Sequence, residues 1–304
     1  KGDVSKFRQE YPSSAETAFL SSSRLRFDET ALKALMAYAK SNDDRQCGNL
    51  RLQGDNFDHV TWIPDPRGSV IRWEEPRLGC RYIVAVDTCS GRDQQSGTSS
   101  DPDYHSAQVW RAAYVSPDGV QQAPALVALH HSRDDTDILC ETVAGLAIYY
   151  GRCMIVPERN GMGGLHVVKV LLKMRQNVFR RGAVVQRKKV ETEEEKLDQF
   201  GWDTDQMTKK WIVDQMAPII RQEGVQIKAP EVIQEFLWFV ISHDGKCGAM
   251  PGRHDDHVIA ACIALYNIGA ATEYRIGRVA AVNLMRLASD PTYMAPNGFR
   301  RRLS

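Results

Sequence analysis

The sequence has 304 residues, of which 43% are hydrophobic and 25% charged, enough for one large domain or two small ones with a sizeable core. Its formal net charge of +1 does not by itself indicate a nucleic-acid partner. No apolar run reaches the roughly 18 residues of a membrane span, and no signal peptide is recognisable. Seven cysteines, an odd number without a CxxC pair, favour reduced thiols in a cytoplasmic protein over a disulfide framework.

The first part of the chain predicts one helix and several short strands. The spacing of apolar residues favours a helix over Glu29–Lys40. Asn49–Glu75 alternates polar and apolar residues between turns at Gly54 and Gly68, which is typical of short strands.

Three consecutive strands are predicted next. Arg81–Asp87 contains the continuous apolar run Ile83–Val86, as expected of a central strand that is buried on both faces. Ala107–Val115 and Ala125–His130 follow it, with turn residues between them. Strands joined by turns in this way indicate an antiparallel meander.

Helices and strands alternate in the rest of the chain. The helices are expected over Asp137–Tyr150, Leu165–Arg175, Thr208–Gln222, Pro230–Ile241 and from Asp255 or Asp256 onward, and the strands over Cys153–Val156 and Val225–Lys228. A meander followed by this alternation predicts an α/β fold, with a mixed sheet of antiparallel and parallel strands flanked by helices.

Acidic residues stand at the ends of several of these elements. Asp87 follows one buried strand and Glu158 another, while Asp255 and Asp256 open the last helix. Any one acid has an ordinary explanation, because strand ends reach the surface and aspartate is a favoured helix cap. Capping needs only one aspartate, however, and α/β sheets place their sites outside the strand ends, so we expect the four carboxylates to converge.

The predicted acid cluster implies metal ions. Several carboxylates in one place repel one another and cannot all stay ionised without cations, and hard divalent ions such as Mg²⁺ and Mn²⁺ prefer oxygen ligands. Two such ions about 3.5–4 Å apart can activate a water molecule and stabilise the leaving oxygen of a phosphodiester. We therefore predict a two-metal site with Asp87 as the bridging ligand, Glu158 on one ion, and Asp255 and Asp256 on the other.

Several residues near the acids could assist them. The candidate accessory residues are Asp103, Asn160, His254 and His257. His254 either orients a metal-bound water or is an exposed residue at a helix start. The glycines after Asn160 either offer N–H groups to a phosphate or form a tight turn that lets Asn160 hydrogen-bond Glu158.

Basic residues gather in two segments, although the net charge is small. Lys173–Lys189 contains seven Lys or Arg and no acid, and the tail Tyr274–Ser304 contains six Arg and a single acid. Val178–Val190 is predicted to be a basic hairpin that turns at Gly182; it either grips the DNA backbone or is a solvated edge strand. Its candidate DNA-binding residues are Arg180, Arg181, Arg187, Lys188 and Lys189.

Six segments, taken in order, resemble the large subunit of phage terminases. The first is similar to the segment that closes the ATPase domain of that family, and the others to motifs of its ribonuclease H-like nuclease domain. The segments are FRQEYPSSAETAFL (Phe7–Leu20), RLGCRYIVAVDTCSG (Arg77–Gly91), DYHSA (Asp103–Ala107), PERNGMG (Pro157–Gly163), GWDTDQMTKK (Gly201–Lys210) and GRHDDHVIAA (Gly252–Ala261). His105 interrupts the usual Asp-Tyr-Ser-Ala pattern of the third.

The resemblance implies a ribonuclease H-like nuclease domain over residues 77–272. Residues 1–76 are then expected to be the end of the ATPase domain or a linker, with short strands that pack on the nuclease, and residues 273–304 a basic tail. The implied activity is a metal-dependent endonuclease that cuts concatemeric double-stranded DNA, with Lys209 and Lys210 as further DNA contacts. The implied partners are the terminase small subunit and the portal protein, in the host cell cytoplasm during virus assembly, with oligomers only in the full motor and no membrane contact.

The sequence also lacks one motif of a complete packaging motor, and alternative functions are open. The sequence lacks the GxxxxGK[ST] motif, so we expect no ATP hydrolysis, and a chain that begins with Lys1 is expected to be a fragment or a processed product. Two alternatives are open: another ribonuclease H-like nuclease, such as a resolvase or transposase, or a non-catalytic docking module of the packaging motor. The terminase-like segment Phe7–Leu20 argues against the first, and the intact set of acids against the second.

Replacing Arg187, Lys188 and Lys189 with alanine tests the basic hairpin. Each phosphate contact contributes about 0.9 to the slope of log K against log salt on duplex DNA, so we expect a slope flatter by about 2 to 3 units. Binding should weaken on all duplexes alike, because phosphate contacts carry no sequence information. Binding isotherms at low salt, where screening is least, measure this; an unchanged slope would mean that the hairpin is only a solvated edge.

Overall fold

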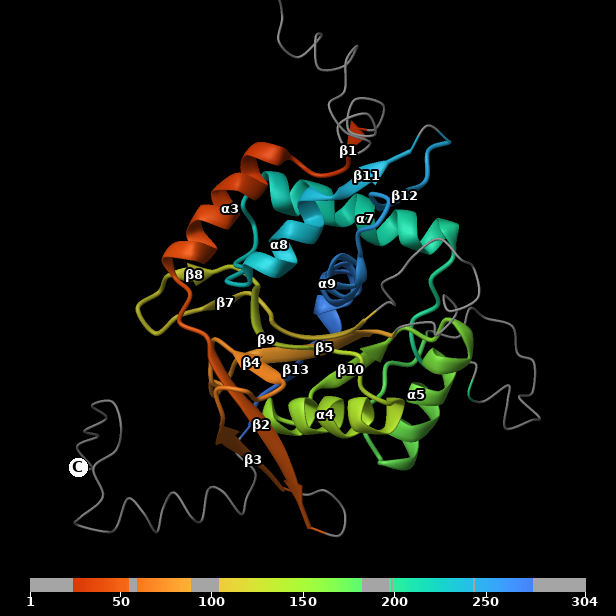
Figure 1. The fold of residues 1–304 in the computed structure, drawn as a ribbon. Coiled ribbons are helices and arrows are strands. Elements are labelled where there is room, and N and C mark those ends of the chain that lie inside the picture. Colours follow the sequence, from red (N-terminus) through yellow and green to blue (C-terminus); the bar gives the residue numbers. More distant parts are fainter. Residues whose placement is uncertain are drawn as a thin grey trace, which may run out of the picture.

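A mixed sheet with helices on both faces forms the centre of the molecule (Figure 1). The computed structural model describes residues 24–54, 59–88, 104–181, 197, 199–242 and 244–275. In spatial order the strands are β10 (Met154–Pro157), β5 (Arg81–Asp87), β6 (His105–Arg111), β9 (Ala125–Ser132), β4 (Val70–Arg72), β2 (Gln46–Gln53) and β3 (His59–Pro64), with β13 (Thr272–Glu273) beside the start of β5. β10 runs parallel to β5, whereas the other neighbours in this sheet are antiparallel.

β5 is central because both of its faces are apolar. Tyr82, Val84 and Val86 pack into the core on one side of the sheet, and Ile83 and Ala85 into the core on the other side. All five side chains are fully buried. This follows from the alternation of side chains along a strand, and it explains why the sequence shows a continuous apolar run here.

The helices form layers on the two faces of the sheet. One face is covered by α4 (Thr136–Tyr149) and α5 (Gly161–Lys173), and the other by α9 (Asp256–Tyr266) (Figure 1). α9 packs on β5 and β6 and is covered in turn by α7 (Gln206–Arg221) and α8 (Pro230–Leu237), and α3 (Glu29–Ser41) packs against α8. Because α9 is apolar nearly all round, it is stable only when buried in this way.

Smaller elements complete the described part of the chain. β1 (Arg24–Leu25) pairs with β11 (Phe239–Ile241), which pairs with β12 (Cys247–Ala249). β7 (Tyr114–Val115) and β8 (Gln121–Gln122) form a hairpin, and the 3₁₀ helix η1 (Ile268–Ala270) follows α9. Among the described helices, none has the length and apolar character needed to span a bilayer.

The predicted fold class is confirmed. β5, β6 and β9 form the expected antiparallel meander, and the chain then passes through α4 before β10 returns parallel to β5. This is the strand arrangement expected of a ribonuclease H-like sheet. The proposed limits of the nuclease domain stay a prediction, and both Phe7–Leu20 and the tail from residue 276 lie outside the described residues.

Two predicted elements between α7 and α9 are wrong. Pro230–Ile241 is not one helix, since α8 ends at Leu237 and the aromatic and β-branched run Phe239–Ile241 pairs with β1 and β12 instead. Val225–Lys228 is not a strand, because it forms a single bridge, between Gln226 and Ala125, outside the ladders of the sheet.

Two other boundaries also differ from the prediction. The strand predicted over Ala107–Val115 stops at Arg111, and Tyr114–Val115 belongs to a separate hairpin. α5 begins at Gly161 rather than Leu165, because glycines have a low helix propensity and hide the start of the helix. Gly164 is needed there, since a Cβ would lie 2.6 Å from the backbone of Arg159.

Ala261→Leu tests the tight packing of α9 on the sheet. Ala261 is fully buried, so the larger side chain should overpack the core and reduce the free energy of unfolding by about 1–3 kcal/mol. Urea unfolding measures the change. The matched control is Ala37→Leu, an exposed position of α3, where we expect a change within about 0.5 kcal/mol; equal effects of the two variants would contradict the packing described.

Candidate active site

The ends of β5 and β10 place two carboxylates side by side. Pro157 pairs with Val86, and the N–H of Glu158 donates to the carbonyl of Val86 at 2.7 Å. Because side chains alternate along a strand, Asp87 faces the same side of the sheet as Ile83 and Ala85, which is the side that α9 covers. The two acids therefore meet under the first turn of α9.

The first turn of α9 brings the other two acids to this point. Asp255 is the N-cap residue, but its side chain makes no capping hydrogen bond. Glu235 of α8 caps the helix instead, since its Oε2 accepts from the N–H of His257 at 2.8 Å. The prediction that one of the two aspartates caps the helix with its side chain is therefore wrong. Neither carboxylate is needed to cap the start of α9.

Asp255 and Asp256 have different surroundings. Asp255 Oδ2 lies 2.9 Å from Lys209 Nζ, and about a quarter of its side chain is exposed (27%). Asp256 is buried, and its Oδ2 accepts from the backbone N–H of Tyr104 at 3.2 Å. His254 Nδ1 lies 4.0 Å from the same oxygen.

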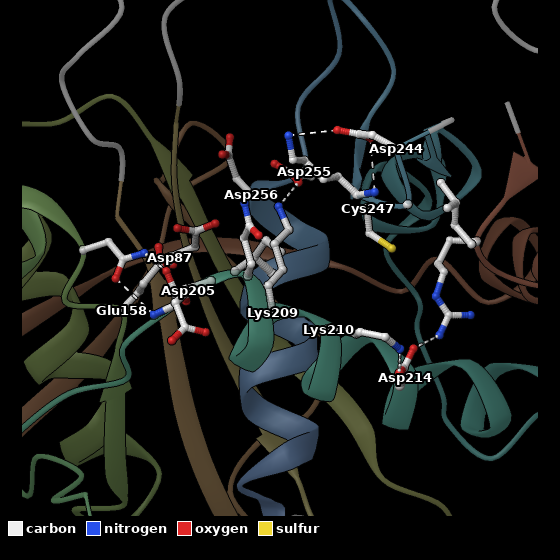
Figure 2. A pocket seen from close by; sticks show the side chains of 18 of the residues that line it. Asp87, Glu158, Asp205, Lys209, Lys210, Asp214, Asp244, Cys247, Asp255 and Asp256 are labelled. Atoms are coloured by element: carbon white, nitrogen blue, oxygen red, sulfur yellow. Dashed lines mark hydrogen bonds and ion pairs between the residues drawn. The ribbon is translucent and has the colours of Figure 1, made fainter.

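All four predicted metal ligands line one open pocket of about 1240 Å³. Figure 2 shows Asp87 and Glu158 at one end, Asp255 and Asp256 above the helix start, and Lys209 reaching between α7 and α9 toward Asp255. The opposite end of the pocket carries charged residues that are paired with one another, namely Arg26, Lys210, Asp214, Asp244 and Lys246. The structure thus places the four predicted acids around one pocket.

The crowded acids disturb each other electrostatically. Burial raises the pKa of Asp87 well above its ordinary value, and the charge of Glu158, a hydrogen bond with that carboxyl and the charges of Asp256 and Asp255 raise it further. Burial lowers the pKa of Lys209, but the charge of Asp255 and their hydrogen bond, with further help from Asp87 and Glu158, outweigh this, so its pKa is raised overall. Lys209 is therefore a cation held among acids.

Asn160 links two walls of the pocket. Its Nδ2 donates to Glu158 Oε1 at 3.2 Å and to the carbonyl of Thr204 at 2.7 Å, and its Oδ1 accepts from the N–H of Thr204 at 3.0 Å. Thr204 precedes Asp205, which begins α7 through a capping box. The structure shows the predicted hydrogen bond from Asn160 to Glu158, but the glycines after Asn160 form the first turn of α5 and not a separate tight turn.

His254 and His257, two of the other predicted accessory residues, do not line the pocket. His257 is buried, and its Nδ1 lies 2.8 Å from Ser106 Oγ, so its ring belongs to the core beneath the site. His254 is not a freely exposed helix-start residue, because its ring contacts that of Tyr104 edge-on at 5.6 Å. Asp103 lies outside the described residues.

The predicted DNA-binding residues are described only in part. Lys209 and Lys210 line the pocket, and Lys210 pairs with Asp214. Arg180 donates to Gln199 Oε1 at 3.0 Å, and Arg181 Nη1 lies 3.1 Å from Asp203. Arg187, Lys188 and Lys189 fall outside the part of the chain that the structure describes.

The donor set of the pocket suits hard divalent ions. Carboxylate oxygens are the ligands that Mg²⁺ and Mn²⁺ prefer, and burial, followed by the neighbouring carboxylates, raises the pKa of Asp87. Within the described ranges, however, no three His, Cys, Asp or Glu side chains are gathered closely enough to hold a metal ion. A metal ion held by these acids would therefore require their side chains to move closer together.

Sequence reasoning missed Glu235 and Tyr104. A signal for Glu235 was present, because this acid lies in the apolar stripe of α8 among Val232, Ile233 and Phe236, and a buried acid needs hydrogen-bond donors. Tyr104 acts through its backbone N–H, which no residue pattern could reveal.

Comparison with known proteins finds a resemblance to terminase nucleases. No protein-family model matches the sequence, and no curated protein matches it. Among solved structures, the chain is similar to the magnesium-bound large terminase nuclease of thermophilic phage G20c, with 16% identity over 66% of this chain and 89% of that one and a TM-score of 0.43. It is also similar to the large terminase nuclease domain of Thermus phage P74-26, with 15% identity over 69% and 92% of the two chains and a TM-score of 0.43. Other structures of the G20c nuclease contain cobalt or zinc. These solved structures belong to the same family that the sequence motifs resemble.

Asp87→Asn tests the electrostatics of the site. Asp87 has a folded-state pKa above its ordinary value of 3.8, so the folded protein binds the proton more tightly than the unfolded chain. Its contribution to stability is therefore full below about pH 4 and is lost as the pH rises through the raised pKa. In EDTA, Asp87→Asn should gain stability relative to the wild type as the pH is raised from about 4 to 8, as measured by urea unfolding. Parallel pH curves for the two proteins would refute this.

Proposed function

We propose that this protein is the nuclease part of a viral DNA-packaging terminase, a metal-dependent endonuclease. The observation that carries the proposal is the convergence of Asp87, Glu158, Asp255 and Asp256, from the ends of two parallel strands and the start of a helix, in one open pocket. Packing alone gives no reason to place four acids together, because crowded carboxylates destabilise the folded state when they are ionised.

The residues have distinct roles under this proposal. Asp87 is central and would bridge two Mg²⁺ or Mn²⁺ ions, with Glu158 holding one ion and Asp255 and Asp256 the other. When bound, these ions would supply an activated water and stabilise the leaving oxygen of the phosphodiester. Asn160 holds Glu158 in place through its side-chain amide, and Lys209, which pairs with Asp255, would supply a positive charge to a phosphate oxygen.

The proposed substrate is concatemeric double-stranded DNA. The pocket is open, and Arg26, Lys210 and Lys246 at its far end, which pair with Asp214 and Asp244, are side chains that suit contacts to phosphates rather than bases. The terminase small subunit and the portal protein are the proposed partners, in the host cell cytoplasm during assembly, by the resemblance of the sequence motifs. This chain would cut DNA without hydrolysing ATP itself.

A plasmid-nicking assay with Mn²⁺ or Mg²⁺ tests the activity. The wild type should nick supercoiled DNA only with metal, and Asp87→Asn and Asp256→Asn should reduce nicking to background, because both residues are buried at the proposed ions. Asp255→Asn should retain partial activity, since this residue is more exposed and a neutral side chain frees Lys209.

The control variant is Asp244→Asn, at the far end of the same pocket, where Asp244 pairs with Lys246; it should nick like the wild type. A well-folded Asp87→Asn protein that still nicks would place the catalytic site elsewhere. A wild type that binds DNA but never cuts it would favour the docking module.

A further inference from the structure

The cap of α9 comes from another helix. The first N–H groups of a helix have no partner within it, and an aspartate at the N-cap normally accepts from them with its own side chain. In this protein Glu235 accepts from the N–H of His257 at 2.8 Å and also from that of Val258. Glu235 is itself buried, with 7% exposed.

Hydrogen bonds from the sheet hold the same turn. Gln108 of β6 donates from Nε2 to the carbonyl of His257 at 2.9 Å, and Ser106 Oγ lies 2.8 Å from His257 Nδ1. The backbone N–H, the backbone carbonyl and the ring of His257 are therefore all engaged by buried neighbours. Such a fully bonded buried network favours one arrangement of the helix start.

We propose that Glu235 is a positioning residue for Asp255 and Asp256. By occupying the N–H groups that Asp255, as the N-cap residue, would otherwise cap, it leaves the carboxylates of Asp255 and Asp256 at the pocket. The inference rests on the proposed function, because the role proposed for these two carboxylates is to hold metal ions. Residues that orient metal ligands without touching the metal typically change metal affinity by roughly 10- to 100-fold when they are removed.

Glutamine can replace the side chain without losing the cap. Burial, followed by the charge of Asp256, raises the pKa of Glu235 to about 9, so the capping group is a neutral carboxyl at neutral pH. Glu235→Gln keeps an oxygen acceptor of similar shape, whereas Glu235→Met keeps the length but removes the acceptor. Comparison of these two variants separates the hydrogen bonds from the packing.

The experiment measures Mn²⁺ binding to the full chain by calorimetry and amide exchange in EDTA. We expect Glu235→Met, and Glu235→Ala as a second variant in case the first does not fold, to bind Mn²⁺ roughly 10- to 100-fold more weakly and to exchange the amides of His257 and Val258 faster. Glu235→Gln should restore both properties. The matched control is Asp28→Ala, which removes the cap that Asp28 provides to Ala31 of α3, outside the pocket; it should lower stability without changing Mn²⁺ affinity.

The two measurements separate this inference from the proposed function. Unchanged amide exchange in the Met and Ala variants would overturn the inference, as would faster exchange with unchanged Mn²⁺ affinity, since Glu235 would then only stabilise the helix. A wild type that binds no Mn²⁺ would overturn the proposed function; in that case exchange in EDTA still decides whether Glu235 holds the turn that carries the aspartates.

Discussion

Negative charge crowded at the ends of two parallel strands is the constraint on which the rest of the structure depends. The register of β10 against β5 places Glu158 directly beside Asp87, and the cover of α9 keeps both acids largely away from solvent. Water cannot disperse charges in such a place, so desolvation and repulsion act together. The sheet thereby fixes the position of these carboxylates, and groups from other elements must neutralise them.

The groups that compensate this negative charge differ in how firmly they are held in place. The N–H of Tyr104 and the amide of Asn160 are neutral donors held by the backbone or by several hydrogen bonds, so they orient Asp256 and Glu158 in any state of the site. Lys209 is different, because its charge sits on a long and partly exposed side chain that pairs with Asp255. Under the proposed function, Asp255 would hold a divalent ion in place of this ammonium, and Lys209 would then be available to the substrate.

The sequence predicted the elements that carry the acids and offered the bond from Asn160 to Glu158, but it did not predict the other groups that hold the acids. Apolar runs revealed β5 and β10, and the apolar stretch after Asp256 revealed α9, because these patterns are local. The ion pair of Lys209 with Asp255 joins residues 46 apart, and Asn160 and Thr204 are 44 apart. Such partners depend on the tertiary fold, which also overrode local preference where Phe239–Ile241 became a strand instead of the end of a helix.

The register of α9 depends on polar contacts in an otherwise apolar core. Apolar packing alone tolerates small shifts of a helix that is buried on all sides, and a shift by one residue turns the helix by about 100°, which would take Asp256 out of the pocket. Gln108 prevents this, because it donates to the carbonyl of His257 and accepts from Trp110 Nε1 at 2.9 Å. A different register would leave these buried groups unsatisfied, at a cost of about 1–3 kcal/mol for each. The geometry of the acids therefore depends on side chains inside the sheet that never touch the pocket.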